Sequence, residues 1–310
     1  MTTDGGEGAD DSESTSGRDS PESTPPDEDQ TQSTEPYEDR AEKSYREILA
    51  QELERGVLEL NRPRAGIFLS GLSAGLDIGF GPLLMAAILA TPTTGLSPVL
   101  LDLITSSAYA VGFIFVVVGQ SDLFTEHTTL AIIPVLDGSA SWSELLRVWG
   151  LIYSSNLIGA TAFAALAVLL GPAYDVVTAD AFTTLATPLL EFSWWATLLA
   201  ATLAGWLMGL LTWLVSASRS TISALVSVWL VALVIGYMHL PHSIAGTVEV
   251  LFGLFGGRGV SVLDFGRFLL LSTVGNIVGG TVFVGLLKYG HATQGGREQG
   301  GDTDNPETQS

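Results

Sequence analysis

Two short polar stretches interrupt long apolar runs of this sequence. One, HLPHSIAGT at residues 239 to 247, places His239 and His242 on either side of a Leu-Pro pair. The other, GQSDLFTEHTT at residues 119 to 129, brings Thr125 and His127 close to carboxylates. The unperturbed pKa of histidine lies near neutrality, so such a ring can take up or release a proton at physiological pH. The residue types therefore point to proton chemistry at breaks in an apolar environment.

The composition identifies the elements that must position these residues. The chain has 310 residues, of which 47% are hydrophobic and 15% charged, and its mean hydropathy is +0.39. The apolar content is concentrated between about residue 65 and residue 290, in segments of roughly 20 residues, which is the length a helix needs to cross a bilayer. We therefore expect an all-α, polytopic protein of the cell membrane.

Six crossings are predicted, and the second and fifth are long and interrupted. The interruptions are the two polar stretches, near residues 120 to 128 and 239 to 247. The predicted spans cover residues of about 65 to 90, 99 to 136, 147 to 170, 194 to 216, 220 to 256 and 267 to 289. Residues 171 to 193 are expected to form an acidic loop.

The flanking segments differ from the apolar region. Residues 1 to 43 are rich in Asp, Glu, Ser, Thr and Pro and are expected to be a disordered tail, as are residues 291 to 310. Residues 44 to 62 space apolar side chains at helical intervals among charges, which predicts an amphipathic cytoplasmic helix that lies on the membrane face or packs on the bundle. Residues 63 to 290 would then be the transmembrane domain.

The charge of the chain is strongly acidic. Its 33 Asp and Glu against 13 Lys and Arg give a net charge of -20. Such an excess suits either a halophilic protein or an ordinary solubilising tail. The sequence contains no cysteine, so disulfides and thiolate metal sites are not available. We expect no nucleic-acid partner, no cofactor and no metal.

Basic residues predict the orientation. Arg55, Arg62 and Arg64 precede the first span, and Arg147 and Arg219 fall in loops on the same side. By the positive-inside rule, both termini would be cytoplasmic. Arg258 and Arg267 fall on the opposite side and oppose this assignment without reversing it.

An internal repeat relates the two halves. RVWGLIYSSNLIGATAFAAL from Arg147 can be laid on RFLLLSTVGNIVGGTVFVGL from Arg267, which pairs Asn156 with Asn276. AGLDIG at 74 to 79 similarly resembles AGWLMG at 204 to 209. Three spans repeated as three spans must lie in opposite orientations, which is an inverted 3+3 repeat typical of transporters and channels.

The repeat also indicates where function resides. Backbone that leaves the helix at membrane depth exposes unpaired N–H and C=O groups, so it is tolerated only inside the protein or along a cavity. Two interruptions at corresponding positions therefore predict one pathway shared by the two halves.

The chain resembles the formate/nitrite transporter family over about residues 45 to 290. Four motifs carry the resemblance, in the order DLFT at 122 to 125, NLIGA at 156 to 160, HSIAG at 242 to 246 and NIVGG at 276 to 280. The resemblance implies an aquaporin-like helical bundle, assembled as a homopentamer with one pore per protomer. Members of the family pass small monovalent anions or their conjugate acids, including formate, nitrite and hydrosulfide.

Site residues follow from the same resemblance. Leu123, Phe124 and Thr125 correspond to a loop that narrows the pore and contacts the family's central histidine, which is matched by His242. By the same resemblance, the residues expected to support the broken segments are Asn156, Asn276, Ser243 and Gly246. His239 competes for the central position, and Glu249 lies close by. Pro241 and Gly246 stand where the better-known formate channels have Glu and Asn, so HSIAG is typical of a less-characterised branch.

A working hypothesis for transport follows. Apolar constrictions such as Leu123 and Phe124 would block an anion, which is costly to desolvate, and admit a neutral acid. The anion would take a proton at or near His242, cross as the acid and ionise again. No catalytic residue is assigned, because four histidines without a metal-ligand pattern and no nucleophile motif leave little equipment for an enzyme.

Several alternatives stay open. An aquaporin-like pore for neutral solutes shares the repeat logic, although paired NPA motifs are absent from the sequence. A proton-coupled carboxylate transporter cannot be separated from a channel by sequence. Thr125 could instead satisfy local backbone at its break. Five acidic or basic residues fit either a vestibule or an interface: Asp77, Asp122, Glu126, His127 and Glu249.

Overall fold

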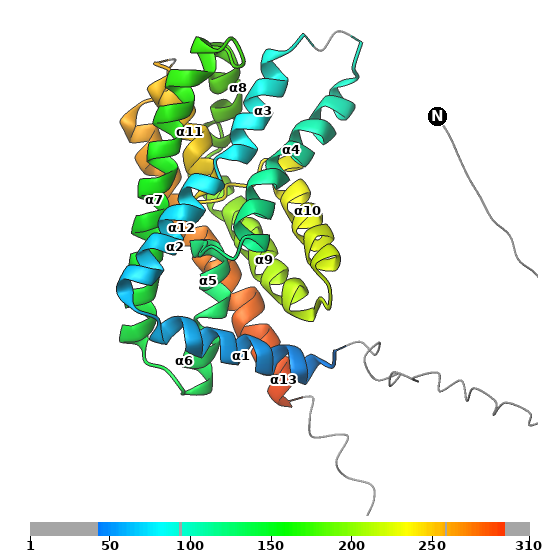
Figure 1. Ribbon diagram of the computed structural model, residues 1–310, viewed down its shortest axis with the longest axis vertical. Coiled ribbons are helices and arrows are strands. Elements are labelled where there is room, and N and C mark those ends of the chain that lie inside the picture. Colours follow the sequence, from blue (N-terminus) through cyan, green and yellow to red (C-terminus); the bar gives the residue numbers. More distant parts are fainter. Residues whose placement is uncertain (1–42, 93–94, 258, 295–310) are drawn as a thin grey trace, which may run out of the picture. The chain divides into compact units, whose positions relative to one another are not determined.

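The computed structural model describes residues 43–92, 95–257 and 259–294. The predicted acidic tail lies outside these ranges except for Lys43, and most of the predicted C-terminal tail and Arg258 lie outside them as well. Within the described ranges, every regular element is a helix (Figure 1).

The helices divide into a leading helix and two repeats. The leading helix is α1 (Tyr45–Asn61). The first repeat comprises α2 (Arg64–Asp77), α3 (Phe80–Ala90), α4 (Pro98–Val118), α5 (Phe124–Leu130), α6 (Ile133–Asp137) and α7 (Trp142–Ala173). After α8 (Ala179–Leu190), the second repeat comprises α9 (Trp194–Ala217), α10 (Thr221–Tyr237), α11 (Ala245–Phe255), α12 (Val262–Val278), the π-helix η2 (Gly279–Leu286) and α13 (Leu287–Gln294).

The lengths of these helices fit a membrane protein. Among the described residues, five helical stretches are long and apolar enough to cross a membrane, and the predicted fifth span is divided between α10 and α11. The outer surface of the bundle exposes large apolar side chains, which in lipid are at no disadvantage: Leu69, Phe115, Leu166, Leu169, Leu199, Leu203 and Leu270. The chain is therefore a multi-pass membrane protein.

The prediction of an acidic loop at residues 171 to 193 is wrong in part, because this segment contains α8. Thr178 caps this helix by accepting a hydrogen bond from the N–H of Ala181 at 3.2 Å. Phe182, Leu185 and Leu189 recur at helical spacing and are buried, and α8 packs on α11 and α3. This apolar periodicity was present in the sequence and outweighs the acidic composition of the segment.

The third and sixth spans begin earlier than predicted. Ser141 and Glu144 form a capping box at the start of α7, and Ser261 and Asp264 form one at the start of α12. In each box a serine hydroxyl and a carboxylate satisfy backbone N–H groups that the first helical turn leaves unpaired. The two boxes are 120 residues apart, as are Asn156 and Asn276.

The first and third spans of each repeat pack with their backbones in close approach. A methyl group at Gly75 of α2 would overlap the backbone carbonyl of Asn156 in α7. Gly205 of α9 meets the carbonyl of Asn276 in α12 in the same way. Small residues at these positions let the helices approach far enough for the asparagine side chains to reach across.

We predict that Gly75→Ala and Gly205→Ala each lower the stability of the fold by about 1–3 kcal/mol, because the added methyl group forces two backbones apart. Thermal unfolding of the protein in detergent measures the effect. Gly150→Ala in α7 is the matched control, since a methyl group there meets no atom within 4 Å. Equal melting temperatures for Gly75→Ala and Gly150→Ala would contradict the close packing.

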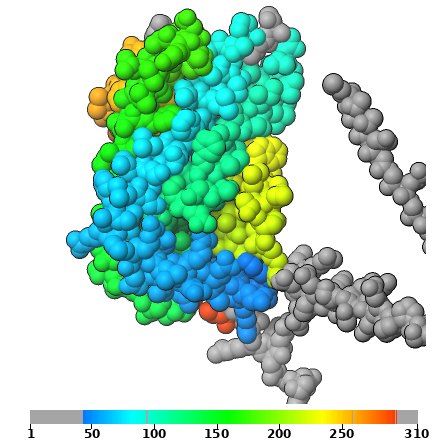
Figure 2. Space-filling model, in the orientation of Figure 1, coloured from blue at the N-terminus to red at the C-terminus, as the bar shows by residue number. Residues whose placement is uncertain are grey.

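The leading helix α1 lies across one end of the bundle, outside the crossing helices (Figures 1 and 2). Lys43, just before it, donates to the Ser216 carbonyl at the end of α9, at 2.6 Å. Glu52 is fully buried on this contact, where it accepts a hydrogen bond from the Ser216 hydroxyl. Arg55 lies 4.0 Å from the same carboxyl. Burial outweighs these two favourable contacts and raises the pKa of Glu52 to about 7.

From the raised pKa of Glu52, we predict that α1 docks more firmly in mild acid. Between the ordinary value of 4.5 and about 7, the folded protein holds a proton on Glu52 that the unfolded chain does not, so stability falls as pH rises through this window. The loss amounts to about 3 kcal/mol at most. Thermal unfolding at pH 5 and pH 8 should show a decrease in Tm that shrinks in Glu52→Gln and persists in Glu54→Gln, an exposed residue of the same helix. An unchanged pH response in Glu52→Gln would refute the assignment.

Candidate functional site

The two helix breaks follow the same backbone path. Each contains one residue in the left-handed region, Gln120 with φ of 59° and His239 with φ of 48°. The N–H of the following residue reaches back to the carbonyl five residues earlier at 3.0 Å, in the pairs Ser121 to Val116 and Leu240 to Ile235. These are the bonds of a helix end closed by a left-handed residue. The breaks are therefore equivalent, with an offset of 119 residues.

This offset is one residue shorter than the offset of 120 that relates Asn156 to Asn276, so it pairs different residues within the breaks. Asp122 corresponds to Pro241, and Phe124 corresponds to Ser243. Leu123 occupies the position equivalent to His242, and both side chains are fully buried. The inverted repeat thus places an apolar side chain at one of two matching positions and a titratable ring at the other.

Asn156 holds the first break. Its Oδ1 accepts from the N–H of Phe124 at 2.9 Å, and its Nδ2 donates to the carbonyl of Asp122 at 2.9 Å and to that of Gly71 at 2.7 Å. The amide side chain is fully buried and satisfies one donor and two acceptors of the main chain. In an apolar bundle those groups have no water to bind.

Asn276 repeats this arrangement at the second break. Its Oδ1 accepts from the N–H of Ser243 at 2.8 Å, and its Nδ2 donates to the carbonyl of Pro241 at 3.0 Å and to that of Ala201 at 2.8 Å. We call these two sets of three bonds the asparagine clamps. Each clamp joins the three spans of one repeat.

The breaks meet at a hydrogen bond between Thr125 and His242. Oγ1 of Thr125 lies 2.8 Å from Nε2 of His242, and both side chains are fully buried. Nδ1 of the ring faces the backbone N–H groups of Ile244 and Ala245, at 3.3 and 3.0 Å. Because N–H groups only donate, Nδ1 is the acceptor and Nε2 carries the hydrogen that is given to Thr125. The hydroxyl hydrogen of Thr125 is then free for another acceptor.

The two histidines of the second break have different surroundings. His239 is exposed and ends α10 with its left-handed backbone. His242 is fully buried, and the ring of Phe113 meets it edge to face with centroids 5.1 Å apart. The structure brings His242, and not His239, against the first break.

Residues predicted beside these occupy several environments. Phe124 packs its ring on Tyr153 and Trp149 of α7, with centroids 4.8 and 6.0 Å apart. A methyl group at Gly246 would press on the ring of Phe268, and Glu249 is buried within α11. The backbone of Ser243 is held by its clamp, but its Oγ is buried with no hydrogen-bond partner among the described residues.

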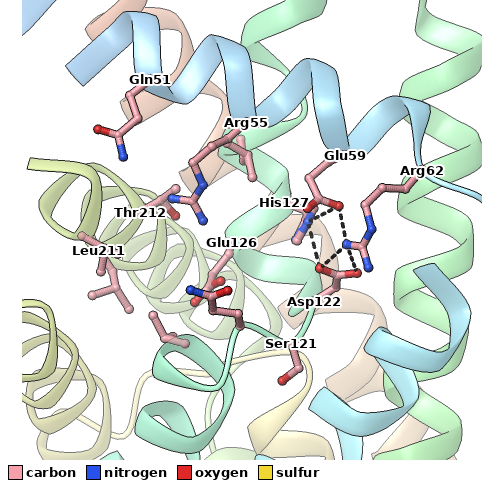
Figure 3. Close-up of a pocket in the computed structure, with 14 residues that line it drawn as sticks. Gln51, Arg55, Glu59, Arg62, Ser121, Asp122, Glu126, His127, Leu211 and Thr212 are labelled. Carbon is pink, nitrogen blue, oxygen red and sulfur yellow. Dashed lines mark hydrogen bonds and ion pairs between the residues drawn. The ribbon is translucent and has the colours of Figure 1, made fainter. Parts of the chain in front are cut away.

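A cavity of about 590 Å³ leads from the α1 end of the bundle toward the first break (Figure 3). We call it the vestibule. Its lining comes from α1, the first break and α9, and includes Gln51, Arg55, Glu59, Arg62, Asp122, Glu126, His127 and Thr212. Asp122, Glu126 and His127 thus take the vestibule alternative left open by the sequence, whereas Asp77 accepts a hydrogen bond from Ser73 at 3.0 Å.

The charges of the vestibule are unevenly paired. Arg62 donates to Glu59 at 2.6 Å and to both oxygens of Asp122 at 2.8 and 3.0 Å. Arg55 has looser contacts, 3.2 Å to Oγ of Ser216 and 4.0 Å to Glu52. The contribution of α1 could not be foreseen, because the sequence gives no signal that this helix folds over the break.

Comparison with known proteins places this arrangement among transport proteins. A sequence model described as formate/nitrite transporter matches residues 46–290. Inner membrane protein YfdC of Escherichia coli is 29% identical over 239 residues, covering 76% of this chain and 74% of that protein. A probable formate transporter of Methanothermobacter thermautotrophicus is 28% identical, over 75% of this chain and 90% of that protein.

Solved structures share the fold. An FNT family ion channel superposes with a TM-score of 0.67 at 23% identity, covering 79% of this chain and 97% of that one. A pentameric formate channel with formate bound superposes with a TM-score of 0.60 at 22% identity, covering 73% and 96%. The expected six-span, aquaporin-like fold with an inverted repeat is confirmed.

The asparagine clamps predict a specific pattern of instability. Asn156→Ala or Asn276→Ala leaves one N–H and one carbonyl of its break buried without the amide partner and removes the tie to the neighbouring helix, which should lower stability by about 3 kcal/mol. Thermal unfolding in detergent measures the loss. Asn61→Ala is the control, since that exposed amide donates to the Val57 carbonyl of its own helix, at 2.8 Å. If the clamp variants melted like Asn61→Ala, the clamps would not hold the breaks.

Proposed function

The chain belongs to the formate/nitrite transporter family, and we propose that it is a channel whose central site, where Thr125 meets His242, passes small weak acids such as formic and nitrous acid. The function that the family supports is transport of small monovalent anions or their conjugate acids. Nitrite transporter NirC of Salmonella typhimurium, 27% identical over 76% of this chain, and the formate-bound channel support these two substrates.

The bond between Thr125 and His242 is the observation that carries this proposal. It joins the two breaks, and Nε2–H donates to Oγ1 of Thr125 because Nδ1 accepts from the main chain. The hydroxyl of Thr125 can therefore donate a hydrogen bond to an oxygen of the substrate. The unpartnered Oγ of Ser243, beside His242, offers a second polar contact. Together these groups would replace part of the substrate's hydration.

The surroundings of the pair favour the neutral form of the substrate. Phe113 packs on His242, and Leu123 and Phe124 precede Thr125 in the chain. All three side chains are buried and offer nothing that could replace the hydration shell of a full charge. The protonated form of a weak acid carries no charge and keeps its hydrogen-bonding groups. We assign Leu123 and Phe124 to the constriction, and Thr125 and His242 to the contact with the acid.

The vestibule would collect the anion before it is protonated. Arg55 is the more loosely paired of its two guanidinium groups and is half-exposed. A cation in a recessed site raises the local concentration of small anions, and Arg55 would do so against the opposing carboxylate of Glu126 in the same lining. Arg62 is compensated by two carboxylates and contributes little to that attraction.

Assembly and orientation complete the proposal. We assign residues 63–290 to the channel domain and 44–62 to a cytoplasmic helix, with both termini cytoplasmic, because the arginines at the α1 end obey the positive-inside rule. The pentameric formate channel supports a homopentamer with one pore in each protomer. Two of the named relatives are described as transporters and both solved structures as channels, which supports a protein without catalytic activity.

Flux through purified protein in liposomes tests the central site. Formate, nitrite, hydrosulfide, acetate and lactate are supplied across a pH series. Flux of at least one acid should fall by about 10- to 100-fold in His242→Asn and in Thr125→Val. Each substitution removes a hydrogen bond of the central site and should raise the free-energy barrier to crossing by about 1.4–3 kcal/mol. His239→Asn, in the same break, is the control and should keep wild-type flux.

Two results would contradict the proposal. If none of the five acids moved while water or glycerol did, the protein would be a pore for neutral solutes. If His239→Asn abolished flux and His242→Asn did not, the site would be assigned to the wrong ring. Mass measurement of a monomer or tetramer in detergent would overturn the pentamer alone.

A further inference from the structure

Three side chains from separate parts of the chain converge on one edge of the vestibule (Figure 3). They are Glu59 near the end of α1, Asp122 in the first break and His127 in α5. Each offers one donor atom, and the three atoms all lie within 4.8 Å of one another. No spacing in the sequence announces this group, because Glu59 is more than sixty residues away from the other two.

The imidazole of His127 is oriented for an external ligand. Its Nδ1 lies 3.0 Å from the Leu123 carbonyl, which can only accept, so Nδ1 carries the hydrogen and Nε2 carries the free lone pair. Nε2 is buried and has no hydrogen-bond partner among the described residues, and the residue as a whole is 4% exposed. A backbone carbonyl that fixes the second ring nitrogen is the usual support of a metal-binding histidine.

The distances around Nε2 are close to those of a metal site. It lies 3.9 Å from Oε2 of Glu59 and 3.8 Å from Oδ1 of Asp122. Ligands about 2.1 Å from a tetrahedral Zn²⁺ ion are about 3.4 Å apart. Small side-chain rotations would close the difference.

Arg62 is the competitor for this position. Its guanidinium lies 2.6 Å from Glu59 and 2.8 Å from Asp122, so it compensates the same carboxylates that a metal ion would bind. It does not hydrogen-bond to Nε2 of His127, which has no hydrogen-bond partner among the described residues. The Arg62 side chain is about a third exposed, at 32%, and can swing into the vestibule when a stronger cation arrives.

We propose that Glu59, Asp122 and His127 form a binding site for a divalent transition-metal ion such as Zn²⁺ or Co²⁺. The imidazole nitrogen favours these ions over Mg²⁺ and Ca²⁺, which prefer oxygen ligands throughout. All three residues line the vestibule, so the ion would enter from the α1 end. Once bound, it ties α1 to the first break and replaces the positive charge of Arg62.

Equilibrium binding to purified full-length protein, with any affinity tag removed, tests this site. Co²⁺ is titrated into the detergent-solubilised protein and followed by its visible absorption, and Zn²⁺ is then added in competition. We expect one ion per protomer, displaced by Zn²⁺ and retained in excess Mg²⁺. Because the readout is binding, its outcome does not depend on whether the protein transports weak acids.

Variants separate this site from adventitious binding. His127→Ala and Glu59→Gln should each weaken Co²⁺ binding by more than the roughly 10- to 100-fold that loss of an outer-shell partner costs. Glu59→Gln changes a partly exposed residue of α1 and keeps the test valid if His127→Ala fails to fold. Arg62→Gln should tighten binding, since it removes the competing cation. His291→Ala, on α13 at the same end of the bundle, should bind as the wild type does.

Several outcomes would overturn the proposal. One such outcome is that the wild-type protein binds no Co²⁺ at concentrations up to about 1 mM. A Kd of that size corresponds to a binding free energy of about -4 kcal/mol. His127→Ala and Glu59→Gln could bind as the wild type does, or Mg²⁺ could displace Co²⁺ as readily as Zn²⁺. In the first case the three side chains form only an ion-pair network around Arg62, and in the others the ion binds elsewhere or by charge alone.

Discussion

The structure depends on one constraint, which is that main-chain polar groups at membrane depth need partners within the protein. Two spans leave the helical path, and each break frees N–H and C=O groups that no water can satisfy. The asparagine clamps supply those partners, and they do so with the same three bonds in both repeats. The other features of the central site follow. Close glycine contacts let the clamps reach across, and the clamped breaks bring Thr125 to His242.

Much of the fold could be predicted because hydropathy and repetition act along the chain. Helix length, the two interruptions and the pairing of Asn156 with Asn276 are properties of local sequence and of its self-similarity. The partners of each asparagine could not be predicted, since Gly71 and Ala201 lie on neighbouring spans. The helix α8 was not predicted for a different reason. Residues 171 to 193 carry acidic residues and no Lys or Arg, which favoured a loop over the regular apolar spacing of the helix.

The site was harder to predict than the fold. HSIAG and DLFT pointed to His242 and Thr125 through a resemblance, and the geometry supplied the direction of the bond between them. The part of the vestibule wall that α1 supplies was not predicted, because α1 folds over the first break from about sixty residues away. Arg62 illustrates the limit. From sequence it counts only as a positive charge beside a span, whereas in the structure it is committed to Glu59 and Asp122.

The clamps have one further consequence, for motion. Each closes within its own repeat, so each clamp ties together the backbones of the three spans of that repeat. A small displacement of one repeat against the other would leave all six clamp bonds intact and would stretch the contact between Thr125 and His242. Such a displacement would therefore change the geometry at the residues that we propose meet the substrate, and it would also strain the other hydrogen bonds between the repeats, Thr129 to Gly280 and Tyr153 to Thr273.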